Sequence, residues 1–285
     1  MNNLLLRILT GTIFVVTLLG SIIWDEMAAT AVISMFWLGG LIEFYRLFQK
    51  HEIVNIRSWL NLGFGVLIYG LLLASLFKWI PGMFSLLSVP LFFVLSITEL
   101  WRKDKNPILN MAVSSFGLFY LITPFILMIY LHHLDQPVIA GTADKQYLPI
   151  LAGFFILVWT NDSFAYLVGS LIGRTKLFES ISPKKTWEGT IGGILFTILA
   201  GYLISLYTST DDTYFWIIGA AIIAPFSTFG DLLESQIKRS LKVKDSGSVL
   251  PGHGGILDRF DAAMFSIPIF ASWVHFYVYF FNWTS

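Results

Sequence analysis

The chain has 285 residues, of which 56% are hydrophobic and 13% are charged, with 18 basic and 18 acidic side chains. Roughly a quarter of the residues of a water-soluble domain are charged, so this composition indicates a protein whose surface lies mostly in lipid. The balanced charge gives no support to a nucleic-acid partner. The lack of cysteine excludes disulfides, thiolate catalysis and cysteine-ligated zinc.

Apolar runs of membrane-spanning length follow one another along the chain. A spanning helix needs about 20 mostly apolar residues. The runs lack the alternation of membrane β-strands and are too long for tilted strands, so the predicted fold class is an all-α, polytopic integral membrane protein. The first run is longer than the core of a signal peptide, which predicts a retained span. Nine spans are predicted, at 4–24, 27–48, 59–78, 80–98, 109–131, 148–172, 189–208, 213–232 and 260–281.

The charges between these runs predict an orientation, because cytoplasmic loops are enriched in Lys and Arg. With the N-terminus in the cytoplasm, 16 of the 18 basic residues lie on the cytoplasmic side, and only Lys78 and Lys145 lie on the other side. We therefore predict a protein of the cytoplasmic membrane with its N-terminus inside and its C-terminus outside.

Polar residues concentrate in the second half of the chain. Short, plain loops join spans one to five, within residues 1–135. The region 136–285 holds spans six to nine and two long, glycine-rich cytoplasmic segments, 173–188 and 233–259. We expect an N-terminal membrane region followed by a C-terminal catalytic region.

The sixth predicted span contains the polar pair Asn161 and Asp162. A carboxylate inside an apolar run costs on the order of 2.5–3.5 kcal/mol on insertion scales, so such residues usually face a wet cavity or a partner. We expect Asp162 to face a substrate site. A structural hydrogen bond within the helix bundle is the alternative.

Ser182 and Pro183 resemble the N-cap and first position of a helix. Lys184 and Lys185 would then lie in the first helical turn, where the helix dipole disfavours cations. That conflict is resolved if an anion binds there, held by backbone N–H groups and both ammonium groups. Lysines that only follow the positive-inside rule are the alternative.

A third polar segment begins near the end of the eighth run. Asp231, Ser235, Lys238 and Lys242 have the spacing of one helical face, which suits a metal ion followed by phosphate groups. Charged residues at helix ends are commonly solvated, and for Lys242 and Glu234 this is the interpretation that we favour.

A loop with few side chains follows, Pro251-Gly252-His253-Gly254-Gly255, whose backbone can approach a ligand closely. Asp258 and Asp261 come next, three residues apart on the first turn of the ninth span. Since Mg²⁺ prefers one or two carboxylates plus substrate phosphate oxygens, we predict a magnesium site built from Asp231, Asp258 and Asp261. Glu43 and Arg46 either support this site or have a simple interfacial role.

The segment from residue 235 to 261 resembles the signature of the phosphatidate cytidylyltransferases, also called CDP-diacylglycerol synthases. It reads Ser235-x-Ile-Lys238-Arg239-x₄-Lys244-Asp245-Ser246-Gly-x₂-Leu-Pro251-x-His253-Gly254-Gly255-Ile-x-Asp258-Arg259-Phe-Asp261. The upstream runs Asn161-Asp162-Ser163-Phe-Ala-Tyr and Ser182-Pro-Lys-Lys-Thr-Trp-Glu-Gly are similar to the same family. The resemblance is close over the C-terminal half, whereas the first five spans match only in length and hydrophobicity, apart from Glu43.

The resemblance implies a homodimeric membrane enzyme that depends on Mg²⁺, with a second cation possible, and whose site faces the cytoplasm. It implies metal ligation around Asp231, Asp258 and Asp261, with Lys238 among the catalytic residues. The residues expected to contact substrate are Asn161, Asp162, Ser182, Lys184, Lys185, Thr186, Ser235, Arg239, Lys244, Asp245, Ser246, His253, Gly254, Gly255 and Arg259.

The implied reaction joins CTP to phosphatidic acid in the membrane lipid. A phosphate oxygen of phosphatidic acid attacks the α-phosphorus of CTP, and pyrophosphate leaves. A CTP-dependent kinase of polyprenol or phytol lipids is an alternative, since it would also need a metal and basic residues. A transporter is a more distant alternative, but it would distribute its polar groups across the midplane and on both sides.

Overall fold

Nine helical segments long and apolar enough to cross a membrane make up most of the computed structural model, within the described residues 3–50, 54–141, 148–208, 213–247, 252 and 254–281. The predicted number of spans and the predominantly helical fold are confirmed for this part of the chain. The elements are α1 (Asn3–Trp24), α2 (Glu26–Gln49), α3 (Ser58–Leu76), η1 (Gly82–Leu87), α4 (Ser88–Ile97), η2 (Thr98–Trp101), α5 (Pro107–Gly141), α6 (Ile150–Ile172), β1 (Lys176–Phe178), β2 (Ser182–Thr186), α7 (Trp187–Tyr207), α8 (Thr213–Ser240) and α9 (Leu257–Phe281).

The helices differ from the predicted spans mainly where a helix continues beyond its apolar run. Helix α5 extends to Gly141, and α8 extends to Ser240. Hydropathy marks the lipid-facing length of a helix and not its end, so the polar last turns of α8 lie outside the predicted span. The fourth span, Gly82–Trp101, is not one α-helix but α4 between two 3₁₀ segments.

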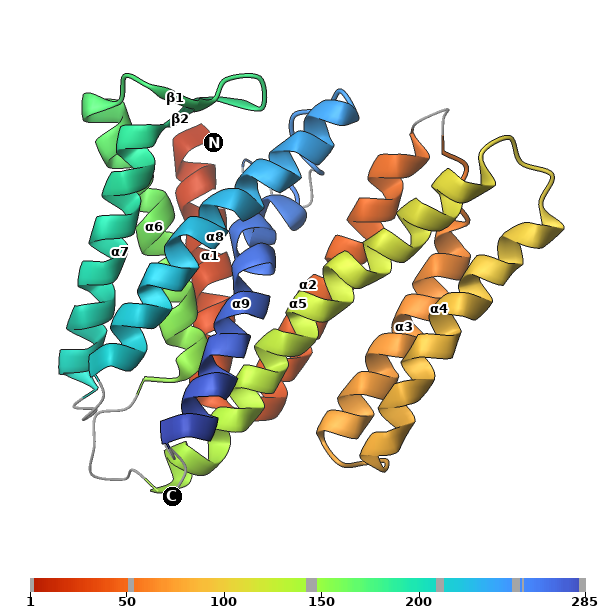
Figure 1. Cartoon of the computed structure of the whole chain (residues 1–285), viewed down its shortest axis with the longest axis horizontal. Coiled ribbons are helices and arrows are strands. Elements are labelled where there is room, and N and C mark those ends of the chain that lie inside the picture. Colours follow the sequence, from red (N-terminus) through yellow and green to blue (C-terminus); the bar gives the residue numbers. More distant parts are fainter. Residues whose placement is uncertain are drawn as a thin grey trace.

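The helices form one packed group with a hairpin of helices beside it (Figure 1). Helix α8 packs against α7 and α9, and α5 packs against both α2 and α9. Helices α3 and α4 pack against α5 and lie farthest from α6 and α7 (Figure 1). The β-hairpin and the C-terminal end of α8 lie at the same end of the bundle (Figure 1), and this end carries the candidate site.

The segment 182–186 is a strand, so the prediction that Ser182 caps a helix was wrong. Strands β1 and β2 are antiparallel, with Lys176 opposite Thr186 and Phe178 opposite Ser182. Helix α7 instead begins after Thr186, whose side chain accepts a hydrogen bond from Gly189 N at 3.2 Å. Thr and Ser are both good N-caps, and the local Ser-Pro signal does not reveal that strand pairing occupies the backbone before Thr186.

Phe260 fixes the first turn of α9 in the centre of the bundle. Its side chain is fully buried and makes aromatic contacts with Phe14 of α1, Phe36 of α2, Phe125 of α5 and Phe155 of α6. Because large buried aromatic side chains dominate core packing, this contact set anchors the turn that carries Asp258 and Asp261.

Candidate active site

Helices α8 and α9 approach each other closely at Gly230. A Cβ atom at this position would lie 2.6 Å from the carbonyl oxygen of Asp261, so only glycine allows the approach. The following residue, Asp231, is thereby brought next to the first turn of α9. Asp261 interacts electrostatically with Asp231 and with Asp162 of α6, so three helices contribute carboxylates to one region.

Lys185 of β2 supplies a cation to this carboxylate group. Its Nζ lies 2.6 Å from Asp231 Oδ2 and 3.4 Å from the carbonyl oxygen of Thr228. Asp231 Oδ1 accepts a hydrogen bond from Ser235 Oγ at 3.2 Å, one helical turn further along α8. The carboxylates repel one another, and the ammonium group of Lys185 offsets part of that repulsion.

A second group of charges surrounds Lys238, which is buried on the next turn of α8. Its ammonium forms ion pairs with Glu234 and with Asp258 Oδ1, the latter at 2.6 Å. A buried charge is stable only when it is paired, so Glu234 and Asp258 fix the lysine in place. The interpretation of Glu234 as a solvated residue was therefore wrong, because only 3% of it is exposed.

The other oxygen of Asp258 organises the segment that precedes α9. Asp258 Oδ2 accepts hydrogen bonds from Ser246 N at 3.0 Å, from Ser246 Oγ at 2.9 Å and from Gly255 N at 2.8 Å. Gly252 and Gly254 have φ values of +80° and +81°, in the left-handed region that favours glycine. Pro251 and His253 lie outside the described residues.

Asn161 is buried and joins α6 to α8, whereas its neighbour Asp162 has an accessible side chain. Asn161 Nδ2 donates to Ser227 Oγ at 2.9 Å and to Thr228 Oγ1 at 3.2 Å. Asp162 also interacts electrostatically with Lys185 and Arg259. Asn161 thus has a structural hydrogen-bonding role, while Asp162 lies at the carboxylate group, and its contact with substrate stays a prediction.

Other predicted site residues have local or solvent-facing positions. Arg239 Nη1 donates to the carbonyl oxygen of Val243 at 3.0 Å, which closes the end of α8. Lys242 lies beyond the end of α8 with φ +53° and is exposed, so it does not continue the polar face of the helix, and its interpretation as a solvated residue is confirmed. Lys184, Lys244, Asp245 and Arg259 are exposed, and Ser182 is half-buried.

The predicted metal ligands do not form a single group. Within the described residues, no three His, Cys, Asp or Glu side chains are close enough together to hold a metal ion. Asp258 is engaged with Lys238, Ser246 and Gly255, whereas Asp261 lies with Asp231. Since Mg²⁺ is commonly bound by one or two carboxylates plus substrate phosphates, Asp231 and Asp261 fit the ion without a third protein ligand.

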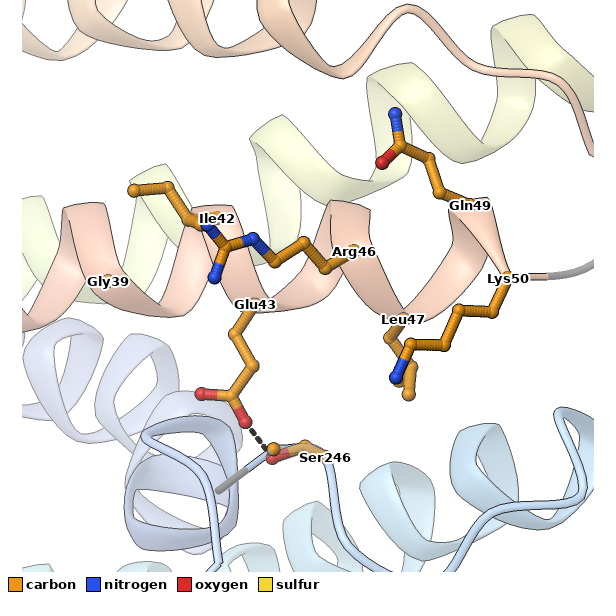
Figure 2. Close-up of a pocket in the computed structure, with 9 residues that line it drawn as sticks. Gly39, Ile42, Glu43, Arg46, Leu47, Gln49, Lys50 and Ser246 are labelled. Carbon is orange, nitrogen blue, oxygen red and sulfur yellow. Dashed lines mark hydrogen bonds between the residues drawn. The ribbon is translucent and has the colours of Figure 1, made fainter. Parts of the chain in front are cut away.

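A cavity of about 360 Å³ adjoins this site where α2 meets Ser246 and Gly247 of the α8–α9 connection (Figure 2). Figure 2 shows Glu43 directed from α2 toward Ser246, with Arg46 on the next turn of the helix and Lys50 just beyond its end. Glu43 is only 5% exposed. The rest of the lining consists of Gly39, Ile42, Leu47, Gln49 and Gly247.

A model of the cytidylyltransferase family matches residues 5–277 of the chain. The chain belongs to the cytidylyltransferase family. A relative from Bacillus subtilis (strain 168) called phosphatidate cytidylyltransferase is 31% identical over 264 residues, covering 92% of this chain and 94% of the relative. Relatives of the same name from Staphylococcus aureus (strain COL) and Staphylococcus epidermidis (strain ATCC 12228 / FDA PCI 1200) are 50% identical over 117 residues and 45% identical over 116 residues. Each of these two matches covers 40% of this chain and 45% of the relative.

Membership of the family confirms the resemblance seen in the signature segment. Sequence reasoning nevertheless missed Glu234 and Phe260, and it left the role of Glu43 open. A carboxylate inside an apolar helix is itself a signal, because it is costly unless it has a partner. Phe260 is part of the signature segment, but the sequence does not show that it anchors α9, since the chain has 26 phenylalanines.

Proposed function

We propose that this member of the family is a phosphatidate cytidylyltransferase, which transfers the cytidylyl group of CTP to phosphatidic acid and releases pyrophosphate. The product, CDP-diacylglycerol, is a precursor for phospholipid synthesis. The observation that carries the proposal is the match to the Bacillus subtilis relative over 92% of the chain.

The arrangement of charges suits this reaction. The attacking oxygen of phosphatidic acid is already anionic, so no protein nucleophile is needed, and catalysis consists of positioning and charge neutralisation. Two ammonium groups lie beside carboxylates of the site, that of Lys185 next to Asp231 and that of Lys238 next to Asp258. Lys238 is held rigidly by Glu234 and Asp258, which keeps its charge in a fixed place for the phosphates of CTP.

The cofactor of the proposed reaction is Mg²⁺, and Asp231 and Asp261 would hold it. When bound, the ion would neutralise the triphosphate and make the α-phosphorus a better electrophile. Asp162 interacts electrostatically with both Asp231 and Asp261 and adds negative charge beside the proposed ion. Asp258 instead acts through Lys238 and the segment before α9.

The proposed setting is the cytoplasmic membrane, with the site facing the cytoplasm. The charge distribution of the loops supports this orientation. CTP would then reach the site from the cytoplasm. The acyl chains of phosphatidic acid stay in the lipid and enter between helices. We propose that the enzyme is a homodimer, in keeping with the family, and that residues 136–285 form its catalytic region.

The test is the purified protein supplied with CTP, phosphatidic acid and Mg²⁺. Formation of CDP-diacylglycerol with an equal amount of pyrophosphate is the expected result. Release of CDP in place of pyrophosphate would identify a lipid kinase and contradict the proposal. The same incubation without Mg²⁺ is the control, and it should give no product.

A further inference from the structure

Glu43 is a buried carboxylate far in sequence from the signature segment. It lies near the C-terminal end of α2, within a membrane-spanning helix. A carboxylate in such a place is costly unless hydrogen bonds satisfy it. Among the described residues no cation forms an ion pair with Glu43, so its stability depends on hydrogen-bond donors.

Two donors come from the connection between α8 and α9. Ser246 Oγ donates to Glu43 Oε1 (Figure 2), and Ile256 N donates to Glu43 Oε2 at 2.7 Å. Ser246 lies six positions after the end of α8, and Ile256 lies directly before α9, ten positions further along the chain. One carboxylate from α2 therefore ties two separate points of this connection together.

Two glycines make room for the contact. A Cβ atom at Gly247 would lie 2.5 Å from Glu43 Oε1, and a Cβ atom at Gly255 would overlap the same carboxylate. No larger residue fits at either position while Glu43 is in place. Glycine at positions 247 and 255 therefore leaves the space that the Glu43 side chain occupies.

The contact leads directly to Lys238. Ser246 donates to Asp258 Oδ2 through its backbone N–H, and Gly255, the neighbour of Ile256, donates to the same oxygen. The Ser246 hydroxyl lies within hydrogen-bond distance of both carboxylates and has one proton to share between them. Asp258 in turn holds the ammonium of Lys238.

We infer that Glu43 is a positioning residue for cytidylyl transfer: it fixes Ser246 and Ile256 of the α8–α9 connection so that Asp258 holds Lys238 in place. This inference rests on the proposed function. It gives the N-terminal half of the chain a defined part in the reaction, although Glu43 itself does not touch the reacting atoms.

The test compares Glu43→Gln with Glu99→Gln in the full-length protein. Gln keeps one acceptor oxygen but presents an amide N–H₂ to the second donor, so one of the two contacts is lost. Glu99 is a matched control, because it is also a buried carboxylate of the N-terminal half and pairs with Arg102 at 2.9 Å. Turnover is measured per folded molecule at saturating CTP, and amide hydrogen exchange is measured at Ser246, Gly255 and Ile256.

We expect Glu43→Gln to lower kcat about 10- to 100-fold and to speed exchange at these amides, with Glu99→Gln within about twofold of the unaltered protein in both respects. Unchanged kcat in folded Glu43→Gln, or an equal loss in Glu99→Gln, would overturn the inference. If Glu43→Gln does not fold, Ser246→Ala is measured in its place, because it removes the hydroxyl that donates to Glu43. Ser246→Ala should also lower kcat, and normal turnover in this variant would overturn the inference.

The exchange measurement needs no substrate, and this separates the two claims. Failure of the unaltered protein to use CTP, with faster exchange in Glu43→Gln, would count against the proposed function alone. Normal activity of the unaltered protein, with unchanged exchange in Glu43→Gln, would count against the role of Glu43 alone.

Discussion

At the scale of single residues, the structure divides three aspartates that look equivalent in sequence into two kinds. Asp231 and Asp261 interact with each other across the contact of α8 and α9. Asp258 uses both of its oxygens for Lys238, Ser246 and Gly255. A spacing of three residues predicts a shared helix face, but it does not predict which neighbouring helix each carboxylate meets.

This division predicts different responses to Mg²⁺. Asp231→Asn and Asp261→Asn should each lose about 100-fold or more in turnover and should need more Mg²⁺ for half-maximal rate, because Asn removes the charge that retains the ion. Asp258→Asn should also lose activity, since Lys238 loses a partner, but its Mg²⁺ requirement should be unchanged. The measurement is the initial rate as a function of Mg²⁺ concentration for each variant.

If Asp258→Asn needs as much additional Mg²⁺ as Asp261→Asn, Asp258 is a ligand of the metal ion and the division is wrong. Each variant must first be shown to insert and to remain monodisperse in detergent. That control separates a loss of metal binding from a loss of folding.

At the scale of elements, the strand β2 separates two neighbouring lysines. Successive residues of a strand point to opposite faces. Lys185 accordingly reaches Asp231 at 2.6 Å, whereas Lys184 is exposed. A helix start at Ser182, as the sequence predicts, would have placed both lysines at one anion site.

The strand therefore predicts unequal effects of two similar substitutions. Lys185→Ala should lower kcat/KM for CTP by about 10-fold or more, because a charge facing the carboxylate group is lost. Lys184→Ala is the matched control and should stay within about twofold. Steady-state kinetics with varied CTP is the measurement, and equal losses in the two variants would contradict this arrangement.

The elements also show what local sequence can and cannot reveal. The nine spans follow from runs of apolar residues, which are local, and so they were predicted within a few residues at most ends. The hairpin was missed because the Ser182-Pro183 pair imitates a cap. Glu43 and Ser246 are 203 residues apart, so their contact is a property of the packed bundle that no local pattern contains.

At the scale of the whole molecule, the candidate site lies at one end of a bundle of spans (Figure 1). The segments that build it belong to α2, α6, β2, α8 and α9, so the site draws on both halves of the chain. The signature segment and the upstream polar runs predicted the C-terminal contributors. The sequence left the role of the N-terminal contributor, Glu43, open, and the three-dimensional contacts show what it binds.

The proposed orientation predicts which tags are reachable from outside the cell. Tags at residues 140 and 285 should be labelled in intact cells, because both positions follow an odd number of spans. Tags at residues 104 and 180 should be labelled only after permeabilisation. Labelling of position 180 in intact cells would contradict both the orientation and the use of cytoplasmic CTP.

The fate of the phosphorus atoms of CTP tests the central claim most directly. The purified protein is incubated with phosphatidic acid, Mg²⁺ and CTP that carries a radioactive label at either the α- or the γ-phosphorus. Attack at the α-phosphorus predicts that the α-label enters the lipid and that the γ-label leaves in pyrophosphate. Entry of the γ-label into the lipid would contradict cytidylyl transfer.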